Sequence, residues 1–120
     1  MKPHTRRGVA YIAGKLISGK NSSAIYDYNS STWTNFSGNV THDKVSVYDY
    51  GVGNHFSGNG DGKSFSLYHY ANSNHVKLSI SGNTFKGYDY DTGNHYSGSV
   101  NGNSIKIYDY GTSTWYNYSI

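Results

Sequence analysis

Tyrosine and histidine recur at fixed positions along this chain, and they are the first residues whose spacing could serve chemistry. Tyr-Asp-Tyr begins at Tyr26, Tyr48, Tyr88 and Tyr108, and Tyr-His-Tyr begins at Tyr68, so the step is 22 residues once and 20 thereafter. Asn-His recurs in the same frame at residues 54–55, 74–75 and 94–95. Phenol and imidazole groups offer both apolar rings and hydrogen-bonding tips, so the pattern indicates a binding surface built from repeats.

If each repeat is a hairpin, these aromatic side chains share one face of a sheet. Equivalent residues of neighbouring repeats then lie two strands apart, roughly 9.5 Å. An evenly spaced ladder of tyrosine and histidine suits a repeating polymer, notably a sugar chain. The alternative is that the tyrosines only cover a one-layer sheet and satisfy β propensity. The candidate ligand-binding residues are Tyr48, Tyr50, His55, Tyr68, Tyr70, His75, Tyr88, Tyr90, His95, Tyr108, Tyr110 and Trp115.

The central residue of each motif could instead take part in metal chemistry. Asp49, His69, Asp89 and Asp109 fall on one row of the sheet. A ring of oxygen ligands is what a hard cation requires. The simpler expectation is that these carboxylates lie at the rim and accept hydrogen bonds from loop N–H groups. We therefore regard the four residues as weak metal candidates and expect no resident cofactor.

No motif in the chain fits a catalytic arrangement. Residues 58–64 resemble a phosphate-binding loop, but the glycine spacing is wrong and no helix follows. There is no Gly-x-Ser-x-Gly elbow, and serine, histidine and aspartate recur only as parts of the repeat. Since a catalytic site is normally singular and asymmetric, the uniform repeat predicts a protein that is not an enzyme.

The elements that would position these residues are β-hairpins. Gly102-Asn103 is a two-residue turn signal, and the residues on both sides alternate with the period of a strand. The register that follows opposes one glycine to one aliphatic residue in every unit, and in one unit the two have exchanged sides. Such volume compensation is expected of directly opposed side chains. The pairs are Gly38 with Val47, Gly58 with Leu67, Leu78 with Gly87, and Gly98 with Ile107.

The fold class predicted is all-β, an antiparallel meander of about five tandem 20-residue β-hairpin repeats, closed as a flattened barrel or left as a single curled sheet. Between repeats we expect Tyr50 to lie opposite His55, and Asp49 opposite Phe56. The apolar side chains are too small to fill a ten-stranded barrel, so we expect flattening or dimerisation. No helix is predicted, and residues 8–18 are expected to form an irregular first strand.

The amino-acid composition excludes several further classes of protein. The 120 residues include no cysteine and one proline, and the net charge is +3, which excludes a disulfide scaffold, a cysteine-ligated metal and a helical bundle. Residues 1–20 carry five basic side chains and no acidic one. We divide the chain into a basic N-terminal arm, 1–7, and a single β-hairpin repeat domain, 8–120. No signal peptide or transmembrane segment is recognised, so the default expectation is the cytoplasm.

These observations favour a non-enzymatic binding module that presents the Tyr/His ladder to a glycan or another extended partner, a polysaccharide or a protein. One alternative is a structural protein that assembles into homo-oligomers through a sheet edge or the apolar face. A second is contact with nucleic acid through the basic N-terminus. Nucleic acid is the least favoured of these partners.

Overall fold

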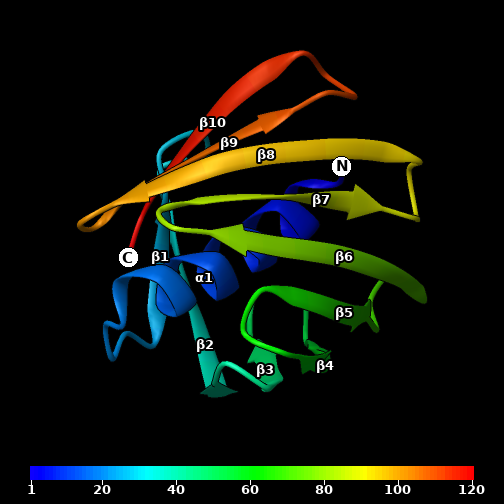
Figure 1. The fold of residues 1–120 in the computed structure, drawn as a ribbon. Helices are drawn as coiled ribbons and strands as arrows, with labels where there is room; N and C mark the ends of the chain where they lie inside the picture. The colour runs from blue at the N-terminus through cyan, green and yellow to red at the C-terminus, as the bar shows by residue number, and fades with distance from the viewer.

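A computed structural model describes all 120 residues, and in it ten antiparallel strands form a closed barrel around one helix (Figure 1). Consecutive strands pair all the way round, and β1 pairs with β10 to close the barrel. The predicted all-β meander of tandem hairpins is therefore confirmed. The elements are α1 (Pro3–Ser18), β1 (Ala24–Asp27), β2 (Thr32–Val40), β3 (Lys44–Asp49), β4 (Asn54–Gly60), β5 (Ser64–His69), β6 (Asn74–Ser81), β7 (Thr84–Asp89), β8 (Asn94–Asn101), β9 (Ser104–Asp109) and β10 (Thr114–Ser119).

The register within the hairpins is the one that the sequence predicts. Gly98 lies opposite Ile107, and Leu78 lies opposite Gly87, so the exchange of sides in one unit is real. At Gly98 an added Cβ would lie 2.1 Å from the carbonyl oxygen of Lys106. The glycines therefore allow a close approach of neighbouring strands that no other residue permits. The remaining two predicted pairs, Gly38 with Val47 and Gly58 with Leu67, are also present.

The register between repeats differs from the prediction by two residues. His55 lies opposite Tyr48 and not Tyr50, and Phe56 lies opposite Val47 and not Asp49. The reason is a loop of four residues, 50–53, that begins one residue earlier than expected. The backbone N–H of Gly53 donates to the carbonyl of Asp49 at 2.8 Å, and Gly53 has a φ of 69°. Because the shift is even, every side chain keeps its face of the sheet.

The expectation of no helix is wrong, and so is the irregular first strand at residues 8–18. Residues Pro3–Ser18 form α1, which lies inside the barrel (Figure 1). Its central residues are apolar on every side and buried, from Val9 to Ala13. A helix of that kind lacks the amphipathic stripe by which surface helices are recognised. The helix supplies the volume that the strand side chains lack, so the apolar face is covered without flattening or dimerisation.

Small residues let the helix fit between the walls. A Cβ on Gly8 would lie 2.7 Å from the Phe56 ring, and a Cβ on Gly14 would lie 2.6 Å from Cδ1 of Ile105. The packed core therefore consists of two partners, the helix and the inner side chains of the strands. Burial of this apolar surface is the main source of the stability of the fold.

The ends of α1 carry conventional signals. Pro3 stands at the first helical position, where a missing N–H costs nothing. Gly19 ends the helix in the left-handed region with a φ of 69°, and its N–H donates to the carbonyl of Lys15. The 16-residue helix is too short and too polar to cross a membrane. Residues 1–7, expected to form a basic arm, are the start of the chain and the first turns of this helix.

Candidate functional site

Aromatic side chains encircle one end of the barrel on its outer wall. Each Tyr-x-Tyr motif ends an odd-numbered strand, and the third aromatic residue of the set follows seven positions after the first, at the start of the next strand. We call these residues the aromatic belt. Its five sets are Tyr26, Tyr28 and Trp33; Tyr48, Tyr50 and His55; Tyr68, Tyr70 and His75; Tyr88, Tyr90 and His95; and Tyr108, Tyr110 and Trp115.

The geometry within a set is nearly the same in every repeat. The ring of Tyr88 lies edge-on to the ring of Tyr90 at 4.8 Å and to His95 at 4.7 Å between centroids. The first tyrosine is half-buried between the other two, because it lies directly opposite the histidine or tryptophan across the strand pair. The second tyrosine lies at the start of the loop and is exposed. Edge-to-face contacts of this kind fix ring orientation.

All twelve candidate residues lie on the outer wall, and the structure groups them into four of the five sets. The fifth set, Tyr26, Tyr28 and Trp33, was not among the predicted site residues. It could have been found, because Trp33 follows Tyr26 by seven positions, as Trp115 follows Tyr108. Closure of β1 against β10 makes these two tryptophan sets neighbours on the barrel.

The rim aspartates point inward, at the same end of the barrel. Oδ1 of Asp49, Asp89 and Asp109 each accepts a hydrogen bond from the backbone N–H two residues later, at 2.8, 3.1 and 2.9 Å. The predicted role in holding the loops is confirmed. Asp49 Oδ1 also accepts a hydrogen bond from the backbone N–H of Val52, at 3.3 Å, and the two bonds stabilise the four-residue loop that sets the register between repeats.

The Oδ2 atoms of Asp49 and Asp109 pair with the basic groups at the start of the helix. Asp49 Oδ2 accepts hydrogen bonds from Arg7 Nη2 at 2.8 Å and Nε at 3.3 Å. Asp109 Oδ2 accepts from Arg6 Nη1 at 3.2 Å and from the amino group of Met1 at 2.9 Å. Positive charge near a helix N-terminus opposes the helix dipole, so these pairs offset a local electrostatic cost.

The four weak metal candidates therefore share one rim, but they do not converge on a common point. The carboxylates of Asp49 and Asp109 face helix cations, and Asp89 Oδ2 accepts a hydrogen bond from the Thr92 hydroxyl at 2.8 Å. No three side chains of His, Asp, Cys or Glu type are placed to hold one metal ion. The rim is thus an internal ion-pair and loop-capping layer.

His69 takes the rim position that aspartate holds elsewhere. It is 1% exposed, and neither ring nitrogen has a hydrogen-bond partner. The imidazole packs on Phe56 at 4.4 Å and near His4 at 5.2 Å between centroids. Burial, and to a smaller extent the neighbouring His4, lower the pKa of His69 to about 4, against the opposing influence of Asp49.

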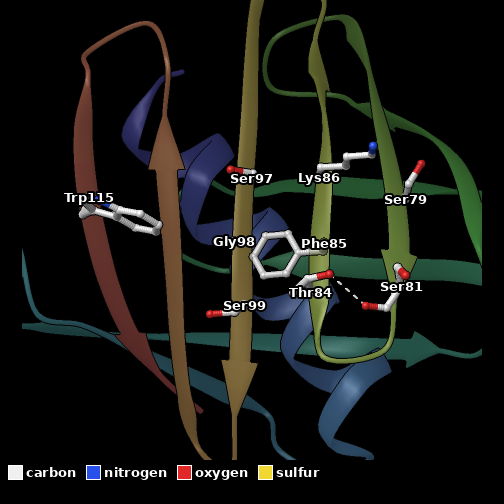
Figure 2. Close-up of a pocket in the computed structure, with 9 residues that line it drawn as sticks. All are labelled: Ser79, Ser81, Thr84, Phe85, Lys86, Ser97, Gly98, Ser99 and Trp115. Atoms are coloured by element: carbon white, nitrogen blue, oxygen red, sulfur yellow. Dashed lines mark hydrogen bonds between the residues drawn. The ribbon is translucent and has the colours of Figure 1, made fainter.

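The outer wall below the belt is hollowed over β6, β7 and β8. One hollow has a volume of about 540 Å³ and is lined by Ser79, Thr84, Lys86 and Trp115 among others (Figure 2). A second, of about 400 Å³, shares Lys86 with the first and adds Tyr88, His95 and Tyr110 from the belt. Sequence reasoning did not find these hollows, since they depend on how the wall bends.

No protein-family model, curated protein or solved structure matches this chain. The site must therefore be interpreted from its own geometry. It offers five similar sets of aromatic rings and several hydroxyl-lined hollows.

Proposed function

We propose that this protein is a non-enzymatic binding module whose aromatic belt holds a polysaccharide. The observation that carries the proposal is the repetition of one aromatic set five times around the barrel. In every set the second tyrosine is between 51% and 61% exposed, so the rings offer open surface to a ligand.

The chemistry of the belt matches that of a sugar chain. The C–H face of a sugar ring packs on an aromatic ring, while phenol, imidazole and indole groups exchange hydrogen bonds with its hydroxyl groups. Neighbouring sets lie two strands apart, roughly 9.5 Å, which is close to the length of a disaccharide. The edge-to-face contacts hold each ring before binding, so little conformational entropy is lost when the ligand arrives.

Three features favour this function over the alternatives expected from the sequence. Pairing of β1 with β10 leaves no sheet edge for assembly, and the apolar face is occupied by α1. Arg6 and Arg7, the main charges of the expected basic arm, are buried or nearly so and paired with Asp109 and Asp49. They are not available to a phosphate backbone.

The test is retention of the protein on polysaccharides, surveyed on a glycan array and by pull-down with insoluble cell-wall polymers. The double variant Tyr110→Ala/Trp115→Ala should weaken binding to any ligand found by at least tenfold. Its melting temperature should change little, because both side chains are about half exposed. The matched control, Asn39→Ala/Asn117→Ala, changes exposed residues of the outer wall outside the belt and should bind like the wild type. If the wild-type protein binds no polysaccharide in either assay, the proposal is wrong.

A further inference from the structure

The hollowed wall extends well beyond the belt. Two further hollows, of about 370 and 390 Å³, adjoin the first pair over β4, β5 and β6, and Lys77 lines both of them as well as the hollow of 400 Å³. The bend that produces this wall coincides with inner-face glycines. At Gly87 an added Cβ would lie only 1.8 Å from the carbonyl oxygen of Lys77, so β6 and β7 approach unusually closely there.

The charge on this wall is positive and not neutralised. Lys77, Lys86 and Lys106 are exposed on the outer face of β6, β7 and β9, and none of them forms an ion pair. The Lys77 ammonium group donates only to the Ser66 hydroxyl, at 3.1 Å, and the Lys106 ammonium lies 6.0 Å from the Trp115 ring centre. No strand carries an aspartate on its outer face, because the strand aspartates all face inward and the others lie in loops or turns.

Hydroxyl groups fill the space between the lysines. Figure 2 shows the side chains of Ser79, Ser81, Thr84, Ser97 and Ser99 around the larger hollow, with Trp115 at its far side. The wall therefore combines hydrogen-bonding hydroxyls, isolated ammonium groups and an aromatic ring. An anionic ligand gains from the lysines, and its uncharged polar groups can bond to the hydroxyls.

We propose that the wall over β4–β8 binds the acidic groups of an anionic polysaccharide, as carboxylate or sulfate, while the adjoining belt holds its sugar rings. This inference rests on the proposed function and names its ligand class. Lysines set among hydroxyl groups match a polymer whose acidic groups stand beside free hydroxyl groups, as they do in an acidic sugar chain. A nucleic acid is bound mainly through many Lys and Arg contacts to its phosphates, whereas this wall has no arginine.

The experiment compares polygalacturonate with its fully methyl-esterified form, which has the same backbone without the charge. Dextran sulfate tests sulfate as the source of the charge, and poly(U) RNA tests a nucleic acid. Affinities are measured at low salt for the wild type and for Lys77→Gln/Lys86→Gln. The control Lys44→Gln/Lys63→Gln removes the same charge from β3 and from the β4–β5 turn, outside the larger hollows.

We expect polygalacturonate or dextran sulfate to bind at least tenfold more tightly than the neutral ester, and Lys77→Gln/Lys86→Gln to abolish that preference while the control retains it. Equal binding of the acidic and neutral forms would overturn the inference and leave the belt proposal standing. Equal losses in both double variants would also overturn it, since they would reflect net charge alone. Tighter binding of poly(U) than of either acidic polysaccharide would assign the wall to nucleic acid instead. The glycan array decides the belt proposal independently.

Discussion

Acid should destabilise this barrel through His69. The side chain is buried and faces His4 and Arg7 of the helix, Asp49 at the end of β3, Asp91 of the β7–β8 loop, and the Phe56 ring. Its pKa is about 4 in the folded barrel, against about 6.5 for a histidine exposed to water. Between these two values the unfolded chain binds the proton more readily, so stability falls as the pH drops below 6.5. From pH 7 to pH 4.5 the loss through this group alone is about 2.5 kcal/mol, since a tenfold difference in proton affinity corresponds to about 1.4 kcal/mol.

The measurement is urea unfolding at pH 7 and pH 4.5 for the wild type and His69→Leu. Leucine removes the titration and breaks no hydrogen bond, because neither ring nitrogen has a partner. The variant should lose about 2.5 kcal/mol less than the wild type between the two pH values. The control His42→Leu changes an exposed turn residue and should follow the wild type. Identical losses in the wild type and His69→Leu would show that the imidazole is not held neutral by its surroundings.

Two further predictions concern packing. Ile12→Ala removes a fully buried side chain of the helix and should cost about 2–5 kcal/mol in urea unfolding, whereas Leu16→Ala, at a partly buried position, should cost less. Equal effects would contradict the placement of the helix core in the barrel. Gly98→Ala places a Cβ 2.1 Å from a backbone oxygen and should cost at least about 2 kcal/mol, while Ser99→Ala on the same strand should change stability by less than about 0.5 kcal/mol. A neutral Gly98→Ala would refute the close strand approach.

The hairpins could be predicted because their information is local. A turn glycine and the alternation of side chains fix the pairing of Gly98 with Ile107, and compensation of volume across the pair provides an internal check. The loops between repeats carry a different kind of information. Their register depends on the Asp49 side chain, which accepts hydrogen bonds from two loop N–H groups. Sequence alternation alone allowed a register two residues away, since an even shift keeps every face.

The helix could not be predicted from periodicity. The run from Val9 to Ala13 is apolar throughout and contains no polar face, so it shows neither helical nor strand alternation. The available signals were Pro3 and Gly19 at the two ends, together with the unfilled volume of the barrel. The small strand side chains indicate that volume is missing, and the sequence alone predicts flattening or a second chain to make it up. A segment of the same chain supplies it.

Only part of the candidate site could be predicted, because one part depends on local hairpin register and the other on the shape of the closed barrel. Belt residues follow from the hairpin register, so all twelve fall on the outer wall. The hollows between Lys77 and Trp115 depend on the bend of three neighbouring strands at inner-face glycines. That curvature is a property of the closed barrel, and no single repeat contains it.

The position of the helix also determines when this protein can fold during synthesis. Arg6 is translated before its partner Asp109, which lies 103 residues later, and β10, the strand that closes the barrel, follows Asp109. The helix therefore has no complete enclosing wall while the earlier hairpins are made, and part of its apolar surface stays uncovered until β10 is available to pair with β1. Contacts so distant in sequence slow folding. Complete burial of the helix therefore requires the strand that lies furthest from it in this sequence.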